Sequence, residues 1–231
     1  KKLAEEDPYA PLGLRLGSMT VLPSIDLSAG YDTNPQRVAP QSKPKGSRLI
    51  QVSPALTMTS DWSQHQLQVD LRGSYNEYLD VKDSNRPSLN GLVSFRGDVT
   101  RDSTINLQLR ELIESERPGS INLPSSVKGR LLYFDTGASL GWTQKFGAAS
   151  LTATGTVDRW TYQDGTTRAG AAFSQQDRNY TAYGAKLRGA YEATPGVTPF
   201  VEVSADTRVY DSRFDVAGYQ RSSNGLQVRA G

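Results

Sequence analysis

The segment from His65 to Tyr78, HQLQVDLRGSYNEY, alternates between apolar and polar side chains. Leu67, Val69 and Leu71 fall on one parity, and amides and charges of both signs fall on the other. In a β-strand successive side chains point to opposite faces, so a period of two predicts a strand with one apolar and one polar face. The fold of the chain depends on which of these faces meets water.

The same alternation recurs along the chain, and no helical period competes with it. We expect about ten strands, many of them longer than the ~5–6 residues usual in soluble sheets. The other alternating segments lie near residues 25–31, 50–58, 93–100, 105–110, 138–142, 151–158, 183–191, 201–206 and 224–231.

The connections between these segments alternate in length. Short turns are expected near residues 61–64, 101–103, 147–149 and 193–196, and longer polar loops near 33–47, 80–87, 115–129, 163–177 and 211–224. Outer-membrane barrels combine short periplasmic turns with longer external loops, whereas a Greek-key sandwich has no reason to sort its loops by end. The loop pattern therefore favours an up-and-down barrel with a periplasmic N-terminus.

Aromatic residues cluster near the ends of the expected strands. The long-loop ends carry Tyr31, Tyr75, Tyr78, Tyr133, Phe134, Trp160, Tyr162, Tyr180, Tyr183 and Tyr210, and the short-turn ends carry Trp62, Trp142, Phe146, Tyr191 and Phe200. Two aromatic belts are typical of a barrel embedded in lipid. Glycine and alanine thin the apolar parity between the belts, which lipid tolerates and a packed core does not.

These patterns predict an all-β fold, an antiparallel up-and-down transmembrane β-barrel with about ten strands in this chain. Its apolar face would meet lipid, and its polar face would line the interior. Residues 17–231 would form the barrel. Residues 1–16 lack alternation and are rich in charge and proline, so we expect an N-terminal periplasmic extension or a plug. A mean hydropathy of −0.53 argues against a helical membrane protein.

Three blocks resemble alphaproteobacterial outer-membrane β-barrel proteins of the "putative β-barrel porin 2" type: DPYAPLGLRLGSMTVLPSIDLSAGYDTNPQR, YFDTGASLGWTQKFG and YEATPGVTPFVEVSADTRVYD. The resemblance implies the outer membrane of a Gram-negative bacterium, with its lipid and lipopolysaccharide as partners, and some relatives are associated with exopolysaccharide export. The family's barrels are longer than this chain, which ends partway through an expected strand. We therefore expect the N-terminal part of a larger barrel; closure between the first and tenth strands is the alternative.

The polar parity carries the candidate pore residues. Acids and bases two positions apart share a face there, so individual pairs are expected to neutralise each other. Arginines are in excess among the residues of this polar parity, and together they would favour anionic or sugar-like solutes. The candidate lumen residues are Asp70, Arg72, Arg96, Asp98, Arg110, Lys186, Arg188, Glu202, Asp206 and Arg208.

Catalytic and metal chemistry find little support in the sequence. The chain has one histidine, His65, and no cysteine, so no histidine-based triad, zinc site or cofactor site is expected. His65 lies just past a predicted turn and is expected to be structural or solvated. The net charge of +2 gives no case for a nucleic-acid partner.

Two functions remain. The first is a porin-like channel of the outer membrane for hydrophilic solutes or for polysaccharide export. The second is a non-conducting structural or accessory barrel that acts with protein partners in an envelope complex.

Overall fold

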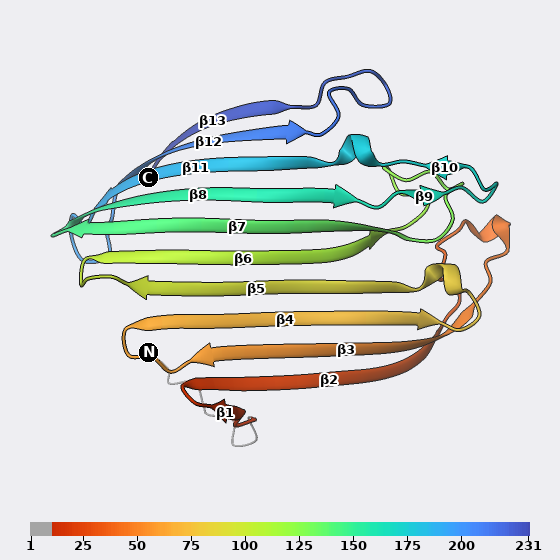
Figure 1. Ribbon diagram of the computed structural model, residues 1–231, viewed down its shortest axis with the longest axis horizontal. Helices are drawn as coiled ribbons and strands as arrows, with labels where there is room; N and C mark the ends of the chain where they lie inside the picture. Colours follow the sequence, from red (N-terminus) through yellow and green to blue (C-terminus); the bar gives the residue numbers. More distant parts are fainter. Residues whose placement is uncertain (1–10) are drawn as a thin grey trace.

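A computed structural model describes residues 11–231, and these residues form one antiparallel sheet of 11 strands in the order β1-β2-β3-β4-β5-β6-β7-β8-β11-β12-β13 (Figure 1). A separate two-stranded hairpin, β9–β10, lies in the loop after β8. The strands are β1 (Leu14–Leu16), β2 (Met19–Asp32), β3 (Ser47–Ser60), β4 (His65–Tyr78), β5 (Arg86–Asp98), β6 (Ser103–Glu116), β7 (Leu131–Phe146), β8 (Ala149–Tyr162), β9 (Gly165–Thr166), β10 (Ala172–Phe173), β11 (Tyr180–Tyr191), β12 (Phe200–Tyr210) and β13 (Ser223–Ala230).

The predicted all-β, antiparallel, up-and-down order is confirmed: apart from the separate β9–β10 hairpin, strands that follow one another in the chain are neighbours in the sheet. Within residues 11–231, helical structure is limited to three single 3₁₀ turns, η1 (Pro40–Ser42), η2 (Lys82–Ser84) and η3 (Gln176–Arg178). No helix in this part of the chain is long and apolar enough to cross a membrane.

The long and short connections lie at opposite ends of the sheet, as the sequence predicts. All long loops gather at the right of Figure 1, and the short turns lie at the left. The long loops also pack on one another. Leu123, Val127 and Leu131 form a buried cluster against Phe173, and Arg130 Nη2 donates a hydrogen bond of 3.1 Å to the carbonyl oxygen of Pro35.

The strand register places the apolar positions of neighbouring strands side by side on one face of the sheet and the polar positions on the other. One unbroken row of facing residues is entirely apolar: Leu67, Phe95, Leu107, Leu140, Gly155, Ala185, Ala205 and Leu226. No segment of residues 11–231 covers this face. The exposed fractions of Leu27, Leu140 and Leu226 are 72%, 58% and 77%. A contiguous apolar surface of this extent marks an interaction with a membrane or another protein.

The strands are staggered progressively along the sheet. A row of facing residues runs from Thr59 on β3 to Thr156 on β8 in five steps. Thr59 is one residue from the short-turn end of β3 and Thr156 is seven residues from that end of β8, so the row climbs six residues. With a rise of ~3.3 Å per residue and a strand spacing of ~4.8 Å, this stagger corresponds to a tilt of about 40°, which is the tilt of strands in barrels.

The sheet is nevertheless open. β1 and β13 stand at opposite ends of the strand order and are not paired with each other. The predicted alternative, closure between the first and tenth long strands, is therefore absent from the structure. Of the predicted N-terminal extension, residues 1–10 lie outside the described residues, and Leu14–Leu16 joins the sheet by pairing with Met19–Val21 of β2.

Candidate functional site

All ten candidate lumen residues lie on the polar face of the sheet. The register shows this directly, because one row of facing residues links Asp70 through Arg110 and Asp158 to Arg208. A parallel row contains Asp98, Thr104, Thr143, Thr152, Arg188, Glu202 and Arg229. The structure thus brings the predicted charges onto one surface.

Only some of the predicted neighbours pair with each other. Arg96 Nε donates to Asp98 Oδ1 at 3.0 Å. Asp70 instead accepts hydrogen bonds from Thr57 Oγ1 (3.0 Å) and Gln68 Nε2 (2.8 Å). Within residues 11–231, neither Asp70 with Arg72 nor Asp206 with Arg208 forms an ion pair within 4.0 Å.

Glu202 is the centre of a basic cluster on three adjacent strands. Its carboxylate lies 3.9 Å from Lys186 Nζ, from Arg188 Nη1 and from Arg229 Nη1. The side chain of Glu202 is only 8% exposed, because Lys186 and Arg188 on β11 and Arg229 on β13 lie on either side of it. The Arg188 guanidinium also lies 3.7 Å from the ring centroid of Phe200. This cluster leaves positive charge on the polar face near the short turns.

The polar face also carries acids that the list of candidate residues lacks. The register places Glu114, Glu116, Asp135 and Asp158 on it. Asp158 pairs with Arg110 across Gly137 of the strand between them. The strand walls are therefore nearly balanced in charge, and the expected arginine excess is much reduced. The alternation of apolar and polar residues along β6, β7 and β8 is the sequence signal that could have placed these acids on the polar face.

The aromatic residues at the long-loop end divide between the two faces, so the prediction of one lipid-facing belt there is wrong. Tyr31, Tyr75, Phe134 and Tyr183 share the apolar parity. The remaining aromatic residues share the polar parity: Tyr78, Tyr133, Trp160, Tyr162, Tyr180 and Tyr210. At the other end Phe200 is also on the polar face. The face on which an aromatic side chain lies depends on whether its position in the strand is odd or even, and not on how near it is to the strand end.

Five of these polar-face aromatics form a continuous row across β7, β8, β11 and β12. The Trp160 ring is nearly parallel to the Tyr133 ring (centroids 6.1 Å apart, planes at 12°) and to the Tyr180 ring (6.0 Å, 13°). Tyr162 extends the row at 6.0 Å from Tyr133, and Tyr210 at 5.0 Å from Tyr180. The row is half-exposed at the mouth formed by the long loops.

Two arginines lie against this aromatic row. The Arg178 guanidinium lies 3.8 Å from the ring centroid of Tyr162 and donates to both carboxylate oxygens of Glu116, at 2.7 and 2.8 Å. The Arg208 guanidinium lies 4.8 Å from the centroid of Tyr180. Both contacts are within the range of cation–π interactions. Burial opposes the charged form of Arg178, but the hydrogen bond and the charge of Glu116 outweigh it, so the pKa of Arg178 is raised overall.

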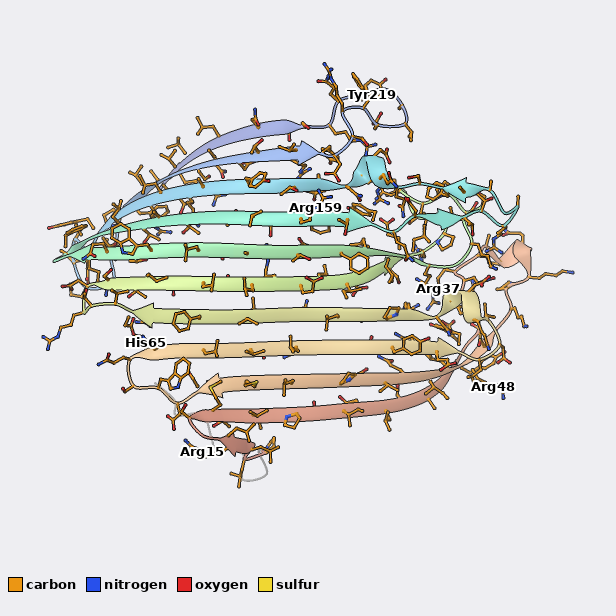
Figure 2. The ribbon with its side chains drawn as sticks, viewed as in Figure 1. Arg15, Arg37, Arg48, His65, Arg159 and Tyr219 are labelled. Carbon is orange, nitrogen blue, oxygen red and sulfur yellow. The ribbon has the colours of Figure 1, made fainter. Side chains whose placement is uncertain are left out.

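A few polar residues interrupt the apolar face toward the long loops. Arg159, labelled in Figure 2, donates to both carboxylate oxygens of Asp211 at 2.6 and 2.5 Å, and Thr136 donates to Glu111 at 2.7 Å. The hydrogen bond from Arg159 lowers the pKa of Asp211, which follows the end of β12. The Arg159–Asp211 pair thus lies at the long-loop end of the apolar face.

His65 has the structural role expected of it. It lies at the short-turn end of β4 (Figure 2), where its Nδ1 accepts a hydrogen bond of 3.2 Å from the backbone N–H of Asp98. Its ring centroid is 6.3 Å from that of Phe95. Both contacts fix the end of the β4–β5 pair.

A comparison with protein families matches residues 7–231 to the family described as "Putative beta-barrel porin 2". The chain belongs to this family. Membership suggests a porin-type β-barrel protein of the outer membrane that is not an enzyme. Searches of curated proteins and of solved structures found no match to the chain.

Proposed function

We propose that the protein is a porin-like channel of the Gram-negative outer membrane that lets hydrophilic solutes, including saccharides, pass along its polar face. One observation carries the proposal: ten long strands keep an apolar face, interrupted only toward the long loops, separate from a charged face from one edge of the sheet to the other. An apolar surface without a covering layer fits lipid, and a polar wall fits water.

The stagger of the strands supports a barrel in the membrane. A tilt of about 40° is what a sheet needs in order to close. In hydrocarbon every backbone N–H and C=O must be paired, so the two open edges have to find partners there. We propose that both edges are paired in the membrane, and that the long loops face the outside of the cell. Cysteine introduced at the exposed Asp83 is expected to react with an impermeant reagent on intact cells.

The Arg159–Asp211 pair suits the level of the lipid headgroups. A charged pair near a strand end costs less there than in the hydrocarbon centre. Lipopolysaccharide, with its anionic groups, is the partner expected at this level of the outer leaflet.

A second candidate function is an accessory barrel whose lumen is blocked. Residues 11–14 border a pocket of about 910 Å³ together with Ser24, Asp26 and Arg72 of the polar face. The N-terminal segment therefore lies beside the wall that a solute would follow. This placement suits a plug or a contact with a partner in an envelope complex.

Conductance across a planar bilayer tests both functions. The full-length protein and a variant lacking residues 1–13 are reconstituted separately. Ion current through the full-length protein supports the channel. Current only after the deletion supports the plug, and silence of both well-folded proteins at all voltages contradicts the channel and favours the accessory role.

A further inference from the structure

The aromatic row forms one wall of a pocket at the mouth of the polar face. The pocket has a volume of about 490 Å³ and lies between the strands and the loop that connects β6 to β7. Its lining combines three aromatic rings, three arginines, one acid and small polar side chains: Tyr133, Trp160, Tyr162, Arg117, Arg130, Arg178, Glu116, Ser115, Ser120 and Asn122. A concave site with aromatic walls and a few convergent polar groups is typical of small-molecule binding.

The aromatic wall suits a ring-shaped polar solute. Tyr133, Trp160 and Tyr162 are half-exposed on a face that is otherwise charged and hydrophilic. Large aromatic surfaces contribute apolar contact area, and their hydroxyl and N–H groups contribute hydrogen bonds. A pyranose has both an apolar C–H face and a rim of hydroxyls, so it matches such a wall.

The arginines give the pocket a net positive charge. Arg178 is neutralised by Glu116, but among residues 11–231 neither Arg117 nor Arg130 has an acidic partner within 4.0 Å. Arg130 is partly buried, and its hydrogen bond to the Pro35 carbonyl fixes its direction.

Burial is the first cause that lowers the pKa of Arg130, followed by the like charges of Arg86, Arg117 and Arg37. Arg37, labelled in Figure 2 among the long loops, is itself paired with Asp32 at 3.3 Å. A partly buried guanidinium with like charges around it gains from an incoming anion, because the anion supplies the acidic partner that it lacks among residues 11–231.

Ser120 adds an unused polar group to the same wall. Its Oγ is buried and has no hydrogen-bond partner among the described residues. Because buried hydroxyls are normally paired, this Oγ is a polar group that the loop leaves without a partner beside the pocket.

We propose that this pocket binds an acidic saccharide, with a pyranose ring against Tyr133 and Trp160 and its carboxylate at Arg130 and Arg117. The inference deepens the proposed function and rests on it for the route by which the solute arrives. The pocket would act as a selective entry site at the mouth of the channel.

Tryptophan fluorescence measures this binding without requiring conduction. The chain has three tryptophans, so replacing Trp62 and Trp142 by phenylalanine leaves Trp160 as the only reporter. The full-length protein is folded in detergent and titrated with trigalacturonate, with the neutral maltotriose, and with inorganic phosphate. We expect a saturable change in Trp160 emission with trigalacturonate, at least about tenfold weaker binding of maltotriose, and no comparable effect of phosphate.

Substitutions assign the two halves of the site. Arg130→Gln is expected to weaken trigalacturonate about tenfold and to bring it near maltotriose, whereas Tyr133→Ala should weaken both saccharides. Arg213→Gln, in the loop after β12, is the matched control and should change neither. Circular dichroism and heat-modifiable gel migration verify that each variant folds.

Four outcomes would overturn the proposal: no binding of trigalacturonate, equal binding of maltotriose, equal effect of phosphate, or affinities that ignore both substitutions. These results are independent of conductance. Binding by a protein that stays silent in bilayers rejects the channel and keeps the pocket, and conduction without binding does the reverse.

Discussion

At the scale of single residues, Gly137 shows how a small side chain organises the polar face. Arg110 and Asp158 lie on either side of it on β6 and β8, and their ion pair crosses above the strand. A Cβ atom at position 137 would lie 2.8 Å from Arg110 Nη2 and 3.1 Å from Arg110 Nε. The ion pair therefore depends on the absence of a side chain.

Gly137→Val is expected to break this pair and to destabilise the folded protein by about 0.2–1 kcal/mol relative to Gly155→Val, because the displaced atoms end flexible, partly exposed side chains and the main loss is the ion pair itself. Gly155 is the matched control on the apolar face, where an added Cβ meets nothing within 4 Å. Urea unfolding in lipid vesicles measures the difference. Equal stability of the two variants would contradict the crossing geometry.

At this scale the sequence predicts which face of a strand a residue occupies, and the role of the candidate residues in lining a pore stays a prediction. All ten candidate lumen residues share the polar face because alternation is a local property of each strand. The same parity places Trp160 with Asp158 on that face, but a rule based on strand ends assigned it to a lipid-facing belt. The loop part of the pocket was beyond sequence reasoning. Arg130 and Pro35 are 95 residues apart and meet only through loop packing.

At the scale of elements, β4 tests which face meets lipid. Val69 is near the middle of the strand on the apolar parity, and Arg72 is on the polar parity. Val69→Arg should cost roughly 2–4 kcal/mol in a lipid-folding assay, whereas Arg72→Gln should be nearly neutral. If Arg72→Gln cost more than Val69→Arg, the assignment of the lipid-facing and water-facing sides of the sheet would be wrong.

The loop between β8 and β11 is held by one carboxylate. Asp164 accepts hydrogen bonds from the Gln175 N–H (2.6 Å), Ser174 Oγ (3.0 Å) and Gln176 Nε2 (3.0 Å). These bonds, the backbone one first, lower the pKa of Asp164. The lowered pKa means that the stabilisation is present above the unfolded pKa of about 3.9 and is lost as the pH falls through the folded pKa.

We therefore expect residues 163–179 to become sensitive to protease as the pH falls below about 4. Asp164→Asn should produce the same sensitivity at pH 7, and Asp102→Asn in a short turn should not. Limited proteolysis followed by mass spectrometry locates the cuts. A loop that stays protected in Asp164→Asn would show that the hydrogen bonds of Asp164 do not hold it.

Element order could be predicted almost completely from the sequence. The ten long strands, the long loops and the short turns follow from alternation and turn composition. The stagger and the open edges did not follow, because register is set by pairing between strands and not within them.

At the scale of the whole molecule, the polar wall is nearly balanced in charge. Arg96 pairs with Asp98 and Arg110 with Asp158, so the wild-type channel should show little preference between small anions and cations. Arg96→Gln with Arg110→Gln should shift the reversal potential toward cations. Asp98→Asn with Asp158→Asn should shift it toward anions by a similar amount. If neither double variant changes the selectivity, ions do not follow this wall.

The central claim is that the apolar face meets lipid and the polar face meets water. Because the chain contains no cysteine, single cysteines along β7 can each carry one spin label without a background. Collision rates with lipid-soluble oxygen and with a water-soluble nickel chelate are then measured in lipid vesicles. Labels at Ala138 and Leu140 should collide mainly with oxygen, and labels at Ser139 and Gly141 mainly with nickel. A period of two with the opposite phase, or no alternation at all, would contradict the account.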